Sequence, residues 1–212
     1  MAVRVKICGI TNWDDAKLAI DAGADALGFN FYAKSSRRIS VSHAREIVRH
    51  MPRNVSTVGV FVNAPPKTVL GVARAVKLGV LQLHGEETPK IVAQLAREFP
   101  VIKAFRVRPS FRVRELEKYD DAAAFLLDGF DDKSRGGAGI RFDWRVAQQA
   151  KRFGPVILAG GLTAKNAAKA CQTVKPFALD VCSGVEAFPG KKDAKKVRAL
   201  MAAVRRRQGK AR

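Results

Sequence analysis

The residues best suited to chemistry in this sequence stand at or just after the ends of short apolar runs. A thiol, an imidazole and two carboxylates occupy four such positions, Cys8, His84, Asp128 and Asp180, and Arg37 follows a fifth run. Side chains of these types transfer protons and bind anions. Taken singly, Cys8 is more typical of a small buried hydrophobic residue, and Asp128 of a loop or helix-capping aspartate. Their shared place at the ends of runs indicates an active site mounted on a scaffold.

Two glycine-containing segments near the end of the chain suit an anion. Gly160-Gly161 lies between an apolar run and a helical one, with Thr163 as the expected N-cap, and Ser183-Gly184 has the same placement one unit later. Glycine lets the backbone approach a ligand closely, and free N–H groups at a helix start attract anions. Each pair could simply turn the chain, but both together predict a phosphate site.

Short apolar runs alternate with longer amphipathic runs along the whole chain. The short runs predict eight strands: Val3–Cys8, Ala24–Phe29, Thr57–Val62, Val80–His84, Val101–Phe105, Ala124–Asp128, Pro155–Ala159 and Phe177–Val181. The longer runs predict eight helices: Trp13–Ala22, His43–His50, Lys67–Lys77, Thr88–Phe99, Phe111–Tyr119, Asp143–Phe153, Ala164–Val174 and Asp193–Arg207. We expect Ser42 to cap the second helix, and Pro65-Pro66 to mark the start of the third.

Strands this apolar are typical of a parallel sheet that helices cover on both faces. A doubly wound open sheet also fits the alternation, but it leaves two edges exposed and normally has fewer strands. Eight regular units therefore favour an α/β fold of one domain, a closed (β/α)8 TIM barrel over residues 1–204. The remaining residues, 205–212, are expected to form a basic, frayed tail. In such a barrel the C-terminal ends of the strands share one mouth.

The composition fits a globular enzyme without a metal. The chain has 212 residues, of which 47% are hydrophobic and 27% charged, which is enough for one substantial core. It has neither a long uncharged apolar stretch nor a signal-peptide pattern, so we expect no membrane partner and a cytoplasmic location. Its cysteines, Cys8, Cys171 and Cys182, lack the paired spacing of a zinc site, and a reducing compartment argues against disulfides.

The net charge of +20 is the one unusual feature of the composition. It is compatible with binding to nucleic acid or a membrane surface, with attraction of an anionic substrate, or with a generally basic proteome. The positive residues are scattered over many helical runs, and only residues 205–212 gather them into a cluster. We expect that cluster to be solvated rather than to contact nucleic acid specifically.

Several sequence blocks carry a family resemblance. They are Val5–Thr11, Gly23–Phe29, Val58–Asn63, Leu81–Glu87, Phe142–Trp144, Ile157–Leu162, Leu179–Val181 and Ser183–Glu186. Over essentially its whole length the chain resembles the phosphoribosylanthranilate isomerases of tryptophan biosynthesis. The first and fourth blocks are highly specific to that family. The block with Gly160-Gly161 is shared with other phosphate-binding barrels.

The resemblance implies an Amadori rearrangement of N-(5-phosphoribosyl)anthranilate to 1-(2-carboxyphenylamino)-1-deoxyribulose 5-phosphate, the third step of tryptophan synthesis from chorismate. An acid protonates the furanose ring oxygen, and a base removes the proton from C2 of the sugar. By resemblance Cys8 is the general base and Asp128 the general acid, and no cofactor or metal is required. Cys171 and Cys182 are expected to be structural.

The resemblance also implies the substrate contacts. Arg37 matches the arginine that holds the anthranilate carboxylate, for which a planar guanidinium is well suited. The adjacent Arg38 stands where the family often has an aromatic residue, which leaves a shifted or shared role for Arg38 open. Asp180 is expected to accept a hydrogen bond from the anthranilate amine, and His84 to line the same site in a structural, orienting or catalytic role. The residues expected to bind the phosphate are Gly160, Gly161, Ser183 and Gly184.

One segment departs from the family pattern. The glycine-rich stretch 133–141 resembles a segment that could close over the substrate, but Ala138 stands where a hydroxyl residue is usual. Ile140 and Arg141 likewise replace a Lys-Thr pair. These changes put a phosphate contact from position 138 in doubt, but not the reaction.

Other interpretations remain open. A related phosphate-binding barrel, such as indole-glycerol-phosphate synthase, would use lysine and glutamate or paired aspartates in place of Cys8 and Asp128. A relative that also accepts a histidine-pathway substrate is compatible with the sequence. A catalytically silent barrel that binds nucleic acid would not need an acid, a base and two anion sites. We expect a small phosphorylated substrate, no nucleic-acid partner, and a monomer or homodimer.

Overall fold

Strands and helices alternate along the chain as the hydrophobic pattern predicts. The computed structural model of the chain describes residues 3–129 and 143–208. The barrel strands are β1 Arg4–Cys8, β2 Ala26–Asn30, β3 Ser56–Phe61, β4 Val80–Leu83, β5 Val101–Val107, β6 Ala124–Gly129, β7 Val156–Leu158 and β8 Ala178–Val181. The α-helices are α1 Trp13–Asp21, α2 Val41–His50, α3 Pro66–Val76, α4 Pro89–Ala96, α5 Trp144–Ala150, α6 Ala164–Val174 and α7 Ala194–Gln208.

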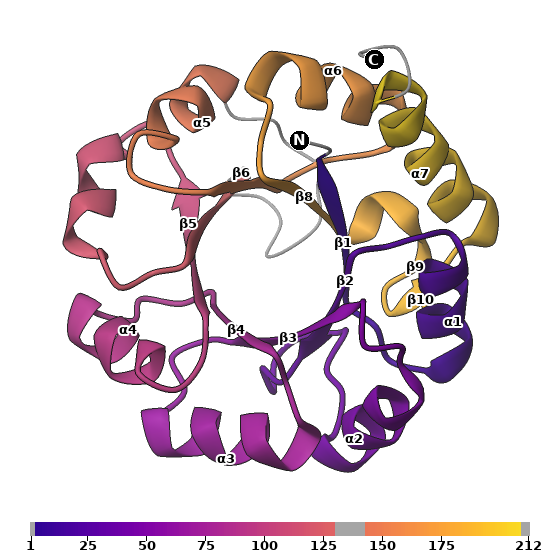
Figure 1. Ribbon diagram of the computed structural model, residues 1–212, viewed down its shortest axis with the longest axis horizontal. Coiled ribbons are helices and arrows are strands. Elements are labelled where there is room, and N and C mark those ends of the chain that lie inside the picture. The colour runs from indigo at the N-terminus through magenta and orange to yellow at the C-terminus, as the bar shows by residue number, and fades with distance from the viewer. Residues whose placement is uncertain (1–2, 130–142, 209–212) are drawn as a thin grey trace.

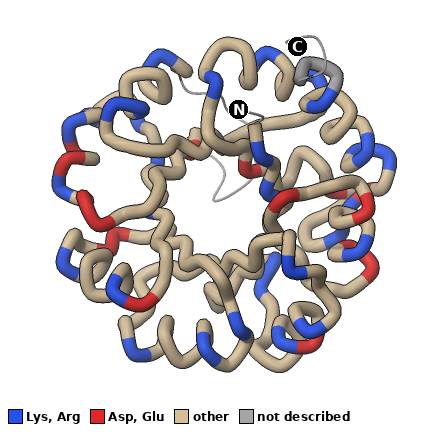
Figure 2. Tube along the Cα trace, in the orientation of Figure 1, with Lys and Arg blue, Asp and Glu red and all other residues tan. Residues whose placement is uncertain are grey.

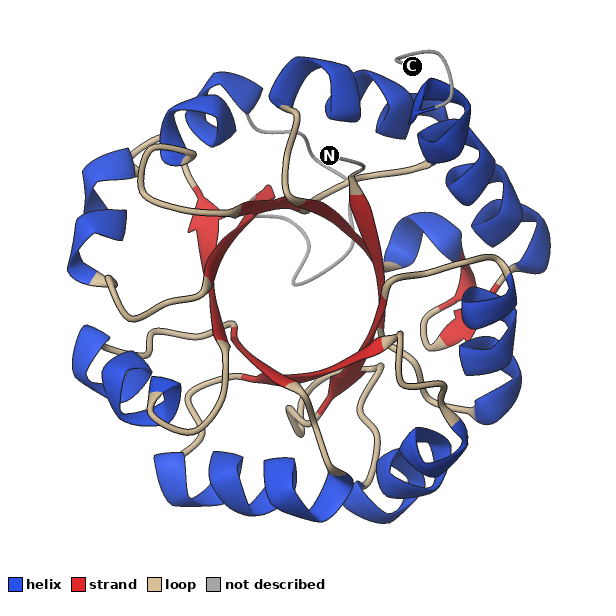
Figure 3. Cartoon of the chain, viewed as in Figure 1, coloured by secondary structure: helices blue, strands red, loops and turns tan. Residues whose placement is uncertain are grey.

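The eight strands form one closed parallel barrel. Neighbouring strands pair in chain order, and β1 closes the ring by pairing with both β2 and β8. Figures 1 and 3 show this ring enclosed by the helices. The predicted (β/α)8 barrel is therefore confirmed.

Side chains along each strand alternate between the barrel interior and the surrounding helices. The interior holds a buried cluster of small and branched residues: Val58, Ile102, Ala104, Ala124, Leu126, Ile157, Ala159 and Ala178. The outward faces of the strands pack against the helices in a larger core that includes Leu81, Leu83 and Leu127. Two positions beyond Leu126, the same alternation places Asp128 on the interior side, at the C-terminal end of β6.

Two of the local predictions were wrong. Helix α2 begins two residues earlier than predicted, and Ser40 rather than Ser42 is its N-cap, because the Ser40 side chain accepts a hydrogen bond from the His43 N–H. The segment Phe111–Tyr119 contains a short 3₁₀ helix, Val113–Lys118, instead of an α-helix. Only Leu116 of that helix is buried. A six-residue segment with one buried side chain gains too little from packing to nucleate a full α-helix.

Two short features after β8 were not predicted. A 3₁₀ turn, Ser183–Val185, leads into an antiparallel hairpin of β9 Glu186–Phe188 and β10 Lys191–Lys192. Helix α7 then continues through Gln208, past residue 205, where the tail was predicted to begin. Arg205 donates a hydrogen bond to the Gly23 carbonyl. Residues 209–212 and the glycine-rich stretch 133–141 lie outside the described residues.

Positive charge is spread around the outside of the barrel. Lysine and arginine residues occur on helices around the whole ring in Figure 2. Among the helices that the structure describes, none combines the length and apolarity that a membrane crossing requires.

Candidate active site

The residues singled out from the sequence converge at the C-terminal mouth of the barrel. Cys8 ends β1, Asp128 is the next-to-last residue of β6, and Asp180 lies in β8 beside Lys6 of β1. His84 follows β4, and its Nε2 lies 3.5 Å from Asp128 Oδ2. The Asp180 carboxylate interacts electrostatically with both Cys8 and His84. Cys8 and Asp128 therefore lie at the same mouth of the barrel, at the ends of β1 and β6.

The Cys8 thiol lies in a buried and positively charged environment. Its neighbour Cys182 forms a hydrogen bond with it, and the ammonium groups of Lys6 and Lys192 lie close by. The hydrogen bond from Cys182 and these two positive charges lower the pKa of Cys8 well below its ordinary value, although burial opposes the shift. The structure therefore favours a thiolate at this position.

Gly28 of β2 makes room for this arrangement. It pairs in register with Cys8, and a methyl group on it would lie 2.7 Å from Cys8 Sγ and 2.9 Å from Lys6 Nζ. Carbon atoms cannot approach that closely without displacing a neighbour, so only glycine fits beside the thiol and the ammonium group.

Lys6 and Asp180 form a buried ion pair beneath Cys8. Lys6 Nζ lies 2.8 Å from Asp180 Oδ1, and the two side chains are only 3% and 8% exposed. Burial raises the pKa of Asp180 to about 6, and the nearby Cys8 thiolate adds to this, while Lys6 opposes it. Burial disfavours the charged form of Lys6, but Asp180 and Cys8 together raise its pKa above the ordinary value. Lys6 is therefore a permanent positive charge against the thiol.

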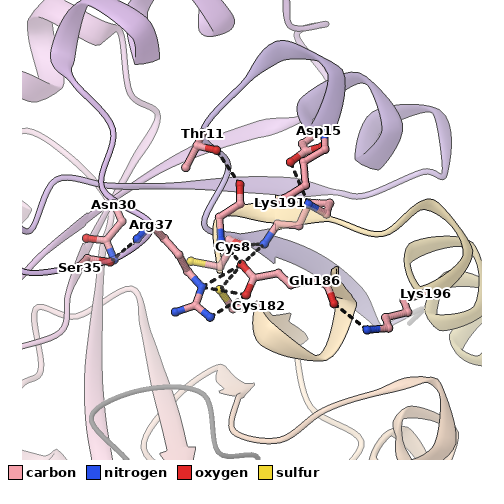
Figure 4. A network of polar contacts seen from close by, with 12 residues as sticks. Cys8, Thr11, Asp15, Asn30, Ser35, Arg37, Cys182, Glu186, Lys191 and Lys196 are labelled. Carbon is pink, nitrogen blue, oxygen red and sulfur yellow. Dashed lines mark hydrogen bonds and ion pairs between the residues drawn. The ribbon is translucent and has the colours of Figure 1, made fainter. Parts of the chain in front are cut away.

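Arg37 is held by a carboxylate that the sequence did not single out. Its Nε lies 2.8 and 3.0 Å from the two carboxylate oxygens of Glu186, and its Nη2 lies 2.6 Å from Oε2 (Figure 4). Lys192 Nζ donates to the same carboxylate at 2.9 Å and to the Cys8 carbonyl at 2.6 Å. Although burial raises the pKa of Glu186, the hydrogen bonds from Arg37 and the charge of Lys192 hold it below its ordinary value.

This network leaves one side of the guanidinium open. Arg37 Nη1 forms no hydrogen bond with any residue that the structure describes. A guanidinium fixed along its Nε edge can present its remaining N–H groups to another planar anion.

The two predicted phosphate segments pack directly against one another. Gly160 and Gly161 both have positive φ angles, 84° and 59°, which disfavour residues with side chains. A methyl group on Gly184 would overlap the carbonyl oxygen of Leu162, so the segment after β8 touches the segment after β7. The side chain of Asn166 stabilises the segment after β7 by donating a hydrogen bond to the Gly161 carbonyl at 2.8 Å.

Gly160 also borders the carboxyl group of Asp128. A methyl group on it would lie 2.9 Å from Asp128 Oδ1. The predicted phosphate segment and the predicted acid therefore adjoin. The predicted N-cap is confirmed as well, because Thr163 caps α6 and its N–H donates to Asn166 Oδ1 at 2.8 Å.

Sequence reasoning missed several members of this site. The sequence analysis assigned no role to Lys6, Gly28, Glu186 or Lys192. The alternation of β1 could have found Lys6, because residues two apart in a strand share a face. The contacts of Lys192 and Glu186 depend on a hairpin too short to leave a periodic signal.

The fold and its mouth define a (β/α)8-barrel enzyme built for proton transfer on an anionic molecule. The family model described as N-(5'phosphoribosyl)anthranilate (PRA) isomerase matches residues 5–203. The chain belongs to this family.

Individual relatives agree with this family assignment. The N-(5'-phosphoribosyl)anthranilate isomerase of Geobacter sulfurreducens is 47% identical over 207 residues, which cover 98% of this chain and 99% of the relative. The crystal structure of phosphoribosyl anthranilate isomerase from Thermus thermophilus has a TM-score of 0.88 and 41% identity, covering 96% and 99% of the two chains. A phosphoribosyl anthranilate isomerase solved in complex with reduced 1-(O-carboxyphenylamino)-1-deoxyribulose 5-phosphate has a TM-score of 0.83 and 41% identity, covering 96% and 98%.

Proposed function

We propose that this chain catalyses the Amadori rearrangement of N-(5-phosphoribosyl)anthranilate to 1-(2-carboxyphenylamino)-1-deoxyribulose 5-phosphate, with Cys8 as base and Asp128 as acid. Family membership supports the reaction, and the reduced product analogue bound by one solved relative supports the substrate. The observation that carries the proposal is the convergence of a thiol and a carboxyl group on one barrel mouth, at the C-terminal ends of β1 and β6, with His84 Nε2 3.5 Å from Asp128.

The reaction needs two proton transfers. Asp128 gives a proton to the furanose ring oxygen, the C1–O bond breaks, and the nitrogen lone pair forms a Schiff base at C1. The Cys8 thiolate then takes the proton from C2, which gives an enolamine. Tautomerisation of the enolamine places a proton on C1 and a carbonyl at C2. Because the overall change is an isomerisation, the thiol loses its proton and the carboxylate regains one before the next turnover.

The charges around Cys8 suit it to the role of base. An ordinary thiol has a pKa of about 8.5 and is mostly protonated at neutral pH. The hydrogen bond from Cys182 and the positive charges of Lys6 and Lys192 favour the thiolate. Cys182, expected to be structural, therefore supports the proposed base directly.

The remaining contacts anchor the two ends of the substrate. Arg37, held along one edge by Glu186, binds the anthranilate carboxylate with its free N–H groups. Asp180 accepts a hydrogen bond from the anthranilate amine. The phosphate binds where the segments containing Gly160, Gly161, Ser183 and Gly184 meet.

The wider setting belongs to the same proposal. The enzyme acts in the cytoplasm on a small phosphorylated substrate, as a monomer or homodimer, without nucleic acid. The acid and the base both come from the protein, so the proposed chemistry calls for no cofactor.

The test is loss of substrate fluorescence on turnover by the purified protein. Cys8→Ala and Asp128→Asn should each lower kcat by roughly 10²–10⁴-fold, the usual contribution of one proton-transfer group. Cys171→Ser is the matched control, because this half-buried thiol lies on α6 and should leave turnover unchanged. Full turnover by either the Cys8 or the Asp128 variant would remove that residue from its role.

A further inference from the structure

Gln82 places a primary amide inside an otherwise apolar part of the barrel. It lies in β4, paired in register with Val60 and Ile102, and its side chain is on the same face as Val80, which packs against the interior cluster. Only 1% of Gln82 is exposed. Burying an amide is unfavourable unless it forms hydrogen bonds. An amide at this position therefore calls for an explanation in terms of what it contacts.

The contact is with His84, one layer closer to the mouth. Gln82 Nε2 lies 2.9 Å from His84 Nδ1. The amide oxygen Oε1 is the one buried side-chain oxygen or nitrogen, among the residues that the structure describes, that lacks a hydrogen-bond partner. Turning the amide over would leave its nitrogen unpaired instead, so the amide alone does not decide its orientation. The histidine decides it.

The two ring nitrogens of His84 have complementary surroundings. Nε2 lies 3.5 Å from Asp128 Oδ2. Once Asp128 has given up its proton, its carboxylate can only accept hydrogen bonds, so a contact with that form requires the proton on Nε2. In the neutral ring Nδ1 then bears a lone pair and needs a donor. The Gln82 amide nitrogen is such a donor, since it has two N–H groups and no acceptor. Both contacts of the ring therefore favour the tautomer with a proton on Nε2 and a lone pair on Nδ1.

We propose that Gln82 is a positioning residue for the reaction, which fixes His84 with its proton on Nε2 so that His84 holds the carboxyl group of Asp128. This inference rests on the proposed role of Asp128 as acid. The Asp128 side chain is 32% exposed, and among the described residues its only polar contact is His84 Nε2. Without that contact the carboxyl group would be free to turn away from the ring oxygen. Misplacement of a catalytic group by about 1 Å can cost on the order of 100-fold in rate.

The first test is the tautomer itself, which can be read without an activity assay. Nitrogen NMR of histidine-labelled protein at pH 8 distinguishes a protonated ring nitrogen from one with a lone pair. The chain has three histidines, so the spectrum of a His84→Asn variant identifies the signals of His84. We expect a lone pair on Nδ1 and a proton on Nε2. A proton on Nδ1 of the wild-type protein would overturn the proposal.

The second test uses a nearly isosteric change. Gln82→Leu should lower kcat by roughly 10–100-fold, the range seen when a partner that orients a functional histidine is removed, with a smaller change in KM. It should also abolish the single-tautomer signal of His84. In a His84→Phe background the same substitution should have no further effect, because Gln82 acts through His84. Independent and additive losses would overturn the proposal and assign Gln82 a packing role.

Control experiments distinguish a failure of the Asp128 assignment from a failure of the Gln82 proposal. Thermal unfolding establishes that Gln82→Leu is folded; if it is not, the wild-type tautomer measurement still decides. Gln148, exposed on α5, offers the matched Gln→Leu control and should leave both kcat and the His84 spectrum unchanged. Full turnover by Asp128→Asn would refute the acid assignment, whatever the tautomer. Loss of turnover by Asp128→Asn alongside unchanged turnover by Gln82→Leu would refute this inference alone.

Discussion

At the level of residues, the proposed chemistry depends on the ionisation of the Cys8 sulfur. Cys8 is buried, which by itself favours the neutral thiol. The hydrogen bond from Cys182 and the charges of Lys6 and Lys192 outweigh that penalty. The charges of Arg37 and Lys192 lower the pKa of Cys182, but its hydrogen bond to Cys8 and its burial raise that pKa well above the ordinary value, so Cys182 remains the protonated partner.

Because Cys182 keeps its proton while Cys8 is ionised, enzyme activity should depend on pH in a specific way. Because the pKa of Cys8 is lowered, its thiolate persists to lower pH than an ordinary thiolate does, and kcat/KM should fall as acid protonates Cys8. Cys182→Ala should move the midpoint of this fall to higher pH, since the thiolate loses a donor. Cys182→Ser should move it less, because a hydroxyl still donates. The rate of Cys8 alkylation by iodoacetamide should follow the same curve, and an identical profile in Cys182→Ala would contradict this account.

The space beside the thiol can be tested at the same scale. Gly28→Ala should reduce turnover by roughly 10–100-fold, because the added methyl group displaces Cys8 or Lys6 from its position. Gly71 in α3 is the matched control, since a methyl group there meets no atom within 4 Å. Gly71→Ala should keep full turnover and unfold at a slightly higher temperature. Equal kinetics for the two variants would show that the gap at Gly28 does not matter.

Among the secondary-structure elements, the β9–β10 hairpin ties the end of the chain to its beginning. Glu186 in β9 forms ion pairs with Arg37 (Figure 4) and with Lys192 of β10. Lys192 also donates a hydrogen bond to the carbonyl of Cys8. A buried carboxylate shared by two cations therefore links Arg37, the proposed carboxylate-binding residue, to the strand that bears the thiol. Removing the carboxylate would leave two positive charges facing each other.

Glu186→Gln should therefore destabilise the fold by about 3 kcal/mol, at the low end for breaking a buried ion pair because the amide still forms hydrogen bonds. It should also raise KM more than it lowers kcat, since Arg37 loses the group that orients it. Urea unfolding and steady-state kinetics measure the two effects. Glu46→Gln removes the carboxylate of an exposed ion pair and should leave the unfolding midpoint nearly unchanged. Equal unfolding midpoints for Glu186→Gln and Glu46→Gln would contradict the stabilising role assigned to the Glu186 carboxylate.

Much of the element order could be predicted from the sequence, because the strands and helices differ in hydrophobic period and length. The eight barrel strands were found on that basis, and Pro66 begins α3 as expected. The hairpin was missed because strands of three and two residues have no period. Within the site, the residues at strand ends could be collected from the sequence. Pairs such as Lys6 and Asp180, 174 positions apart, depend on the register of the closed ring.

At the level of the whole molecule, the net positive charge should attract the proposed substrate, which bears a phosphate and a carboxylate. A net charge of +20 raises the local concentration of anions and speeds their encounter with the protein. We expect kcat/KM to fall as the salt concentration rises from about 10 mM to 500 mM, because screening shortens the reach of the field. The value of kcat, which describes the bound complex, should change much less. A salt-independent kcat/KM would leave the positive charge without this role.

The most direct measurement is a crystal structure of this protein with reduced 1-(2-carboxyphenylamino)-1-deoxyribulose 5-phosphate bound. The account predicts that Cys8 Sγ contacts C2 of the sugar chain, that Asp128 reaches the oxygen derived from the furanose ring, and that Arg37 binds the carboxylate. The phosphate should lie where the segments of Gly160-Gly161 and Ser183-Gly184 meet. A ligand bound with C2 away from Cys8, or with its phosphate outside those segments, would contradict it.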